Sequence, residues 1–214
     1  MAANVRLGPG AVLLSGFACA AAPQLLAAIE DIDRRAPLRR MHTPGGFQMS
    51  VAMSNCGTAG WVTDRTGYRY TATDPDTGEP WPAMPPVFME LAVSAAAAAG
   101  HARFAPDACL INRYQPGARM SLHQDRDEQD YSAPIVSVSL GLPAIFLWGG
   151  LTRTERPARV PLAHGDVVVW GGPDRLRFHG VRALADGAHA LIGPLRYNLT
   201  LRKARSCSPR RGCG

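Results

Sequence analysis

Arg196-Tyr197-Asn198-Leu199-Thr200-Leu201-Arg202 is the run of residues from which the fold of this chain can be inferred. Polar and apolar side chains alternate along it, as they do in a β-strand with two unlike faces. Both arginines fall on the polar face. Such a strand lies either exposed at a sheet edge or with its cationic face toward a buried anion. Because guanidinium groups bind carboxylates through paired hydrogen bonds, the second alternative favours a dianionic ligand.

Further runs with period-two alternation surround this strand, each bounded by glycine or proline turns. They cover residues 108–114, 135–140, 144–148, 166–170 and 176–179. Many short strands at such spacing predict an antiparallel sandwich or barrel. We therefore expect a mainly β protein with flanking helices (α+β), whose barrel lies mostly within residues 107–203.

Upstream of residue 107 the pattern favours helices. Pro23 opens an amphipathic stretch that predicts a helix over 21–35, after a strand at 11–14. A second helix, over 86–99, begins at a pair of prolines and ends before Gly100. Residues 11–22 superficially resemble a signal peptide, but Gly8-Pro9-Gly10 separates them from the preceding charge and Ser15-Gly16 interrupts them.

Composition narrows the functional class. The 214 residues are 46% hydrophobic and 19% charged, which is typical of a soluble globular protein. The net charge of +6 favours an anionic partner such as nucleic acid. Five cysteines without a CxxC pair indicate neither a disulfide framework nor a zinc site. We expect a cytoplasmic protein without a membrane-spanning segment.

A candidate metal site centres on Leu122-His123-Gln124-Asp125. On an extended strand, His123 and Asp125 would point to one face and reach one ion together. Two histidines and a carboxylate form the facial triad of non-haem Fe(II) oxygenases. The third ligand must come from a distant strand, and either His179 or His164 fits, since both lie beside apolar strand-like runs. His164 could instead be a turn residue whose ring bonds the backbone.

The cationic strand and the candidate triad together point to an iron- and 2-oxoglutarate-dependent oxygenase. Arg196 and Arg202 suit the two carboxylates of 2-oxoglutarate. On the 108–114 strand, Asn112 and Tyr114 share a face and could complete the co-substrate pocket. The simpler interpretation, an exposed edge strand, stays open at this point.

Several segments carry a family resemblance that is closer than a shared class of enzyme. They are Pro106 to Tyr114 (PDACLINRY), Ser121 to Asp125 (SLHQD), Ala133 to Gly141 (APIVSVSLG), His164 to Gly172 (HGDVVVWGG), the 196–202 strand, and, upstream, Thr43 to Gly46 (TPGG), Met49 to Met53 (MSVAM) and Trp81 to Pro85 (WPAMP). Together these segments closely resemble the AlkB family of oxidative nucleic-acid demethylases, over roughly residues 10–203. The loops at 62–66 and 152–157 and the tail after Lys203 depart from the family pattern.

The resemblance implies a double-stranded β-helix (jelly-roll) oxygenase with an N-terminal nucleotide-recognition lid. We expect one domain over 1–203, a lid over about 40–85, a core over about 107–203, and a basic disordered tail over 204–214. The roles of the family's functional residues are assigned to the residues of this chain that occupy the matching positions in its motifs. The implied iron ligands, which are also the catalytic residues, are His123, Asp125 and His179. The implied 2-oxoglutarate contacts are Asn112, Tyr114, Arg196, Asn198 and Arg202. The implied substrate contacts are Trp61, Tyr68, Tyr70, Asp127 and Arg153, with Met53 nearby.

The implied reaction is oxidative demethylation of bases such as 1-methyladenine and 3-methylcytosine in DNA, preferably single-stranded, by a monomeric enzyme. 2-Oxoglutarate and O2 become succinate and CO2, and the methyl group leaves as formaldehyde. The target base must be flipped out of a duplex, so Trp61 would stack on it, with His123 on the opposite face. Asp127 would favour cationic bases, and Arg153 would hold phosphates.

Other interpretations remain beside this one. The same iron site could serve an RNA demethylase or a protein hydroxylase, or the chain could be a non-catalytic jelly-roll binding module. Trp61 could be a half-buried packing residue, and Tyr68 and Tyr70 could simply cover the core. Asp127, Glu128 and Asp130 could form a solvated acidic loop.

Overall fold

The computed structural model describes residues 4–206 as two α-helices, one 3-10 helix and thirteen strands. In chain order these are β1 (Val5–Gly8), β2 (Ala11–Leu14), α1 (Ala22–Arg35), β3 (Ala52–Gly57), β4 (Gly60–Asp64), β5 (Gly67–Thr71), α2 (Pro86–Ala98), β6 (Ala108–Tyr114), β7 (Met120–His123), β8 (Ile135–Gly141), β9 (Ala144–Trp148), β10 (Ala158–Leu162), β11 (Val167–Trp170), η1 (Gly172–Asp174), β12 (His179–Val181) and β13 (Arg196–Arg202).

Two antiparallel sheets form the body of the protein. The larger has seven strands in the order β1-β2-β11-β8-β13-β6-β3, and the smaller has four in the order β10-β9-β12-β7. Strands that are distant in sequence alternate within each sheet, because the chain crosses from one sheet to the other as it proceeds. This arrangement agrees with the sandwich or barrel that the sequence pattern predicted, and with the double-stranded β-helix, or jelly roll, that the family resemblance implied.

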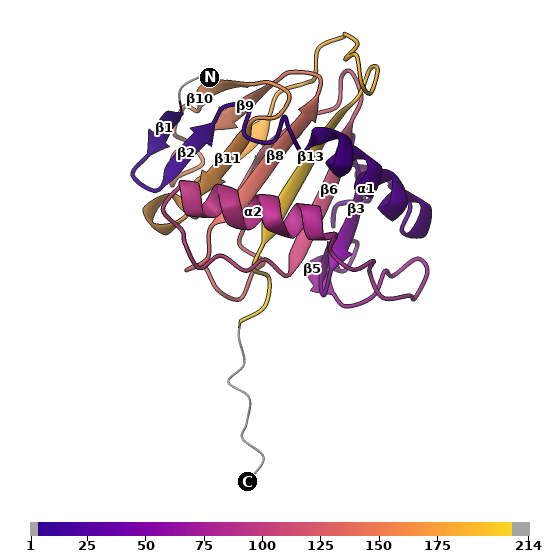
Figure 1. The fold of residues 1–214 in the computed structure, drawn as a ribbon. Coiled ribbons are helices and arrows are strands. Elements are labelled where there is room, and N and C mark those ends of the chain that lie inside the picture. Colours follow the sequence, from indigo (N-terminus) through magenta and orange to yellow (C-terminus); the bar gives the residue numbers. More distant parts are fainter. Residues whose placement is uncertain (1–3, 207–214) are drawn as a thin grey trace.

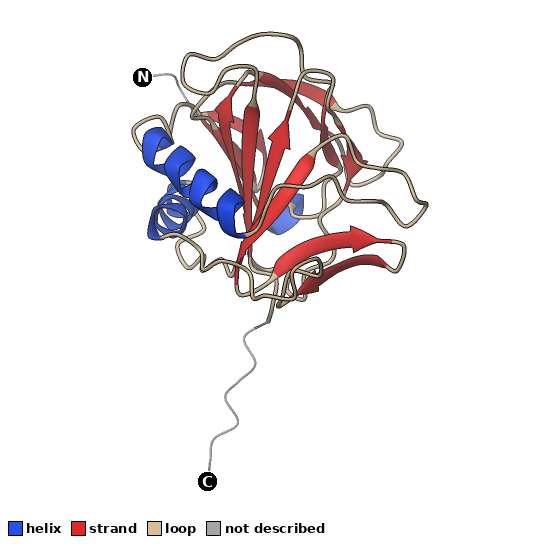
Figure 2. Cartoon of the chain, turned by 90° about the vertical axis from the view of Figure 1, so that its right-hand side faces the viewer, coloured by secondary structure: helices blue, strands red, loops and turns tan. Residues whose placement is uncertain are grey.

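Both helices pack on the outer face of the larger sheet (Figure 1). The buried face of α1 carries Leu25, Ile29 and Ile32, at the spacing of an amphipathic helix. Around Ala92 and Ala95, α2 presents small side chains that allow it to approach the sheet closely. Figure 2, turned by 90°, shows the helices on one side of the sheets.

The second part of the core fills the space between the two sheets. It is rich in aromatic side chains, and Phe146, Trp148 and Trp170 contact one another there. Strand β13 separates the two cores: Leu199 and Leu201 face the helices, whereas Arg196, Asn198, Thr200 and Arg202 line a cavity between the sheets. The alternation in residues 196–202 therefore correctly predicted two unlike faces, both of them buried.

A two-stranded hairpin, β4–β5, stands apart from the larger sheets (Figure 2). It lies in the segment predicted to be the lid. The loop after it is fixed by Asp74, whose buried carboxylate accepts two hydrogen bonds from the Arg39 guanidinium. A buried bidentate ion pair of this kind holds the base of the hairpin in one position.

Several boundaries differ from the expectations. The run 176–179 does not form a strand; β12 begins only at His179, after the short helix η1. The larger sheet also contains β1, β2 and β3, but the other eight strands of the two sheets lie within residues 107–203, as expected. Residues 11–22 form β2 and the start of α1. Within residues 4–206, no helix has the length and apolar character needed to span a membrane.

The predicted tail begins later than expected. Ala204 is buried, and its N–H donates to the Asp107 carboxylate at 2.6 Å. Ser206 donates its N–H to Gln129. The remaining part of the predicted tail, residues 207–214, lies outside the described residues.

Candidate active site

Strand pairing brings the two histidines together. Strands β7 and β12 are antiparallel neighbours, and His179 lies directly opposite His123 in their register. The centroids of the two rings are 4.4 Å apart. Gly180 permits this close pairing, because a Cβ atom there would lie 2.7 Å from the Met120 carbonyl oxygen on β7. The sequence Phe178-His179-Gly180 thus delivers a histidine where any larger residue at 180 would push the strands apart.

Asp125 joins the histidines from a loop. Strand β7 ends at His123, so the carboxylate is not held by the extended strand that the sequence analysis assumed. It is held by Arg202, whose Nε donates a hydrogen bond to Asp125 Oδ2 at 2.9 Å and whose Nη2 forms an ion pair with the same oxygen at 2.7 Å. The nearest carboxylate oxygens lie 3.7 Å from His123 Nε2 and 3.8 Å from His179 Nε2.

Main-chain carbonyl groups set the orientation of both imidazole rings. His123 Nδ1 lies 2.8 Å from the Ser121 oxygen, and His179 Nδ1 lies 3.0 Å from the Arg177 oxygen. A carbonyl oxygen only accepts, so each Nδ1 carries a hydrogen, which leaves Nε2 as the nitrogen that can bind a metal. Both Nε2 atoms face Asp125, which is the arrangement that metal-binding histidines use.

Burial and charge set the protonation states of this cluster. Burial, followed by the charge of His123, lowers the pKa of His179 to about 4, so the ring is neutral at pH 7. Burial by itself would raise the pKa of Asp125, but the positive charges around it, led by Arg202, hold it well below its usual range. The site therefore offers the neutral His179 ring, the His123 ring and one carboxylate as ligand groups.

His164, the competing candidate for the third position, lies elsewhere. Its Nδ1 accepts a hydrogen bond from the Gly141 N–H at 3.0 Å, and its ring stacks on His189 with centroids 4.5 Å apart. His123, Asp125 and His179 have ligand atoms within 4.8 Å of one another, the one such group found among the described residues. His164 fits its alternative interpretation, a turn residue bonded to the backbone.

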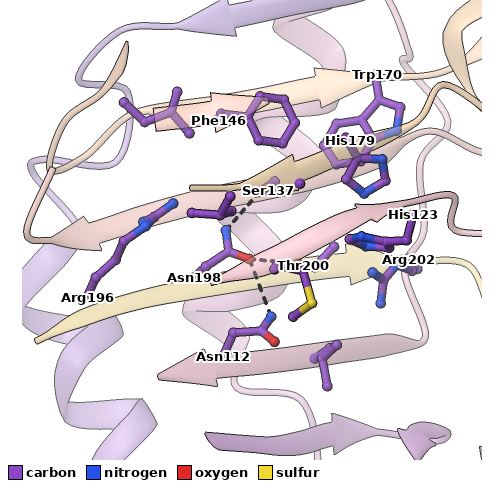
Figure 3. A pocket seen from close by; sticks show the side chains of 15 residues that line it. Asn112, His123, Ser137, Phe146, Trp170, His179, Arg196, Asn198, Thr200 and Arg202 are labelled. Atoms are coloured by element: carbon purple, nitrogen blue, oxygen red, sulfur yellow. Dashed lines mark hydrogen bonds between the residues drawn. The ribbon is translucent and has the colours of Figure 1, made fainter. Parts of the chain in front are cut away.

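A cavity extends between the sheets from the two histidines to Arg196, at its opposite end (Figure 3). Arg196 is 1% exposed, and no carboxylate among residues 4–206 lies within salt-bridge distance of it. Its Nη2 donates to the Ser139 hydroxyl, and its guanidinium lies over the Tyr114 ring. Burial lowers its pKa and raises that of Tyr114 to about 12.

Three unpaired polar atoms belong to residues that line this cavity and mark it as a site for a polar ligand. Within the described residues, buried Arg196 Nε, Trp170 Nε1 and Asn112 Oδ1 have no hydrogen-bond partner. A buried polar group without a partner is costly and rare. The neighbouring Asn198 is fully engaged, donating to Ser137 and accepting from Thr200 (Figure 3). An anionic ligand would accept the missing hydrogen bond from Arg196 Nε, whereas Asn112 Oδ1 needs a donor.

The residues present thus fit both groups that an oxygenase of this kind needs. Two imidazole nitrogens and a carboxylate oxygen match the facial triad for Fe(II). The unbalanced charge of Arg196 matches a carboxylate of 2-oxoglutarate. Arg202 also lines the cavity, but its charge is already shared with Asp125 and Glu128. The two arginines of β13 are therefore not equivalent, which alternation alone could not predict.

The predicted substrate contacts lie on the hairpin β4–β5 and on two loops. Trp61 stacks on Tyr68 with ring centroids 5.6 Å apart, and its Nε1–H donates to Asp127 Oδ2 at 2.7 Å. Tyr70 donates its hydroxyl to Glu128 at 2.7 Å. The structure thus brings the hairpin β4–β5 onto the loop that follows Asp125.

Two other predicted neighbours of the substrate lie on either side of this region. The guanidinium of Arg153, in the loop after β9, lies 5.6 Å from the centroid of the Phe178 ring, next to His179. Met53 is buried on β3, opposite Asn112 in the register. Arg153 is exposed and free to meet a polyanion, whereas Met53 belongs to the wall of the core.

Two buried charged residues were missed. Glu128, which one alternative interpretation placed in a solvated acidic loop, has a side chain that is 2% exposed and forms a salt bridge with Arg175 at 3.0 Å. Arg175 also donates to the main-chain oxygen of Asp125 at 2.7 Å. Neither residue lies in a run with a clear period, so only its position three residues after Asp125 could have drawn attention to Glu128.

Comparison with known proteins agrees with this site. Residues 10–202 match the 2OG-Fe(II) oxygenase superfamily. The chain is 59% identical to the alpha-ketoglutarate-dependent dioxygenase AlkB of Escherichia coli (strain K12), over 92% of both chains. The dioxygenase AlkB of Salmonella typhimurium is 57% identical over the same shares. The solved structure of OsALKBH1 superposes with a TM-score of 0.82 at 29% identity and covers 94% of this chain and 100% of its own.

The chain belongs to the 2OG-Fe(II) oxygenase superfamily and, within it, to the AlkB family. It is an Fe(II)- and 2-oxoglutarate-dependent dioxygenase, and its cofactor and co-substrates are Fe(II), 2-oxoglutarate and O2. A non-catalytic binding module is thereby ruled out.

Proposed function

We propose that this dioxygenase removes alkyl groups from nucleobases such as 1-methyladenine and 3-methylcytosine in DNA. The single observation that carries the proposal is the hydrogen bond between Trp61 on the lid and Asp127, two residues after Asp125. It sets an aromatic platform and a carboxylate beside the candidate iron site. A flipped base needs a stacking surface, and a cationic alkylated base favours a neighbouring negative charge.

In this proposal His123, Asp125 and His179 hold the iron. The bound metal would supply the oxidising power that breaks a C–H bond of the alkyl group, with formaldehyde released. Arg196 would hold a carboxylate of 2-oxoglutarate, and Asn112, Tyr114 and Asn198 would complete its pocket. Arg202 would fix the Asp125 carboxylate and border the same cavity.

On the substrate side, Trp61 and Tyr68 would stack on the base, Tyr70 would hold the lid, and Arg153 would meet a phosphate. The exposure of Arg153 and the net charge of +6 support contact with a polyanion. Single-stranded DNA would be preferred, because no base pair has to be broken before the base is flipped. We place the enzyme, as a monomer, in the cytoplasm, which fits three free cysteines among the described residues.

RNA is the second candidate substrate, supported by a relative of different specificity. The tRNA demethylase abh1 of Schizosaccharomyces pombe (strain 972) is 35% identical over 124 residues, which is 56% of this chain. The described contacts involve base-facing groups, and none of them distinguishes ribose from deoxyribose.

Formaldehyde release from matched oligonucleotides tests the proposal. Single-stranded DNA and RNA of one sequence, each with one 1-methyladenine or 3-methylcytosine, would be incubated with enzyme, Fe(II), ascorbate and 2-oxoglutarate. We expect formaldehyde from both DNA lesions and none from unmodified DNA. Release from RNA alone would assign the RNA substrate instead, and release from neither would overturn nucleobase dealkylation.

A further inference from the structure

Glu128 is a buried carboxylate outside the candidate triad, with partners on three parts of the fold. Its Oε2 accepts a hydrogen bond from Arg175 at 3.0 Å. Its Oε1 accepts from the hydroxyl of Tyr70 on the lid at 2.7 Å and lies 3.5 Å from Arg202 Nε. The side chain is 2% exposed, so water does not compete for these contacts.

Both arginines that contact Glu128 also hold Asp125. Arg202 donates a hydrogen bond to Asp125 Oδ2 through Nε and forms an ion pair with it through Nη2, and Arg175 donates a hydrogen bond to the main-chain oxygen of the same residue. The remaining donor of Arg175, Nε, bonds the Ala133 carbonyl. Each guanidinium therefore spans Glu128 and Asp125, so the position of one carboxylate fixes the position of the other.

The formal charge of this group is balanced. Asp125 and Glu128 carry two negative charges, Arg175 and Arg202 carry two positive ones, and all four side chains are at most 7% exposed. Neutralising Glu128 alone would leave a net positive charge beside the place where a divalent cation is proposed to bind. It would also free the Arg202 guanidinium to turn away from Asp125.

We propose that Glu128 is a positioning residue: through Arg202 and Arg175 it holds Asp125 in its metal-binding orientation, and through Tyr70 it links that orientation to the lid. The inference rests on the proposed role of Asp125 as an iron ligand. It adds that closure of the hairpin β4–β5 and metal binding favour each other, because both require the same orientation of Glu128. Thermodynamic linkage makes this coupling reciprocal.

The test measures metal binding and lid protection in the full chain, without turnover. Metal-stripped wild type and the variants Glu128→Gln, Glu128→Asp and Tyr70→Phe would be titrated with Co(II) in the presence of 2-oxoglutarate. Hydrogen exchange of the amides of β4 and β5 would be followed with and without the metal. Glu90→Gln, on the exposed face of α2, is the matched control, and melting temperatures report folding.

Glu128 acts on Asp125 only through the two arginines, so we expect Glu128→Gln to weaken Co(II) binding roughly 10-fold, the lower end of the range for removing a partner of a metal ligand. Glu128→Asp keeps the charge with a shorter reach, so its affinity should lie between those of wild type and Glu128→Gln. Tyr70→Phe keeps the charged group intact and should bind Co(II) within about threefold of wild type, a loss no larger than that of one net hydrogen bond. Its hairpin, however, should no longer gain protection on metal addition. Glu90→Gln should match wild type in every measurement.

Asp125→Ala separates the two claims. If Asp125→Ala binds Co(II) as wild type does, the proposed iron site fails, and this inference fails with it. If Asp125→Ala loses binding while Glu128→Gln keeps it, only the inference is overturned. Should Glu128→Gln fail to fold, Glu128→Asp decides, because an affinity equal to wild type contradicts a positioning role. Metal-dependent protection of the hairpin in Tyr70→Phe would remove the link to the lid.

Discussion

At the scale of single residues, the two arginines of β13 differ in how their charge is balanced. Arg202 lies against two carboxylates, and Asp125 raises its pKa above the usual value although burial opposes this. Arg196 lies at the other end of the strand, buried with no carboxylate partner among the described residues. An uncompensated buried charge costs stability until a ligand of opposite charge binds. The cavity is thus prepared for an anion at the Arg196 end.

This difference predicts the behaviour of Arg196→Met. The variant keeps the length of the side chain but removes a charge with no partner, so without 2-oxoglutarate it should melt no lower than wild type. The rise in melting temperature that 2-oxoglutarate causes in the Mn(II)-loaded protein should be lost. Arg159→Met, in exposed β10, serves as the control and should keep that rise. A full rise in Arg196→Met would mean that the co-substrate binds elsewhere.

His179 predicts how the stability of the metal-free protein depends on pH. Its pKa is about 4 in the folded protein and 6.5 in an unfolded chain, because burial disfavours the charged ring. Between these values the unfolded state takes up a proton that the folded state does not. The contribution of His179 to the free energy of unfolding is therefore fully present above pH 6.5 and is lost as the pH falls toward 4.

The comparison needs urea unfolding of metal-stripped wild type and His179→Gln at several pH values from 7 to 4.5. The wild type should lose more free energy of unfolding than the variant across this window, at up to ~1.4 kcal/mol per pH unit for one proton. Parallel curves for the two proteins would mean that His179 is not held neutral by burial.

At the scale of elements, the clearest sequence signals were the alternation of polar and apolar residues and the glycine and proline turns that bound each strand. Residues 108–114, 144–148 and 196–202 form strands with the predicted bounds, because glycine and proline turns interrupt a strict period of two. Strand β7 is only four residues long and ends before Asp125. The position of the Asp125 carboxylate therefore depends on Arg202, which is 77 residues away in the chain. The burial of Glu128 likewise depends on Arg175 and Tyr70, and no local pattern encodes it.

The same limit applies to the choice of the third metal-ligand candidate. His164 and His179 both precede or follow apolar strands, and their surroundings in the sequence do not separate them. The register of β12 against β7 does, because it sets His179 opposite His123. Before the structure, the sequence pattern only weakly favoured His179, and the family resemblance was needed to choose it.

The contact between Trp61 and Asp127 leads us to expect that variants of these two residues impair different properties: the binding of all bases, and the preference for cationic bases. Trp61→Ala should lower the binding of every substrate base by about 1–3 kcal/mol, since stacking tolerates different bases. Asp127→Asn should instead lower kcat/KM more for 1-methyladenine and 3-methylcytosine, which are cationic, than for neutral adducts. The measurement is kcat/KM for each lesion in matched single-stranded oligonucleotides.

Trp61→Phe separates stacking from the hydrogen bond to Asp127. It keeps an aromatic ring but cannot donate to the carboxylate, so it should retain more binding than Trp61→Ala. Equal losses for charged and neutral lesions in Asp127→Asn would remove the proposed role of that carboxylate. Succinate formation without substrate should persist in all three variants, because none of these side chains belongs to the candidate triad.

At the scale of the whole molecule, the two sheets, the hairpin and the two helices each have a distinct role in forming the candidate site. The helices cover one face of the larger sheet, which leaves the space between the sheets for the cavity. The smaller sheet supplies both histidines, and the larger supplies both arginines. The hairpin joins them through Trp61 and Tyr70 at the loop after Asp125. Metal, co-substrate and base would therefore meet where these three units converge.

The central claim is that His123, Asp125 and His179 hold the iron that performs dealkylation. It is tested most directly by measuring formaldehyde and succinate together from a DNA oligonucleotide with one 3-methylcytosine. Wild type and His164→Ala should both form formaldehyde in proportion to succinate. His123→Ala, Asp125→Ala and His179→Ala should form neither product while their circular dichroism spectra still report a folded protein. Activity that survives in His179→Ala and disappears in His164→Ala would contradict the account.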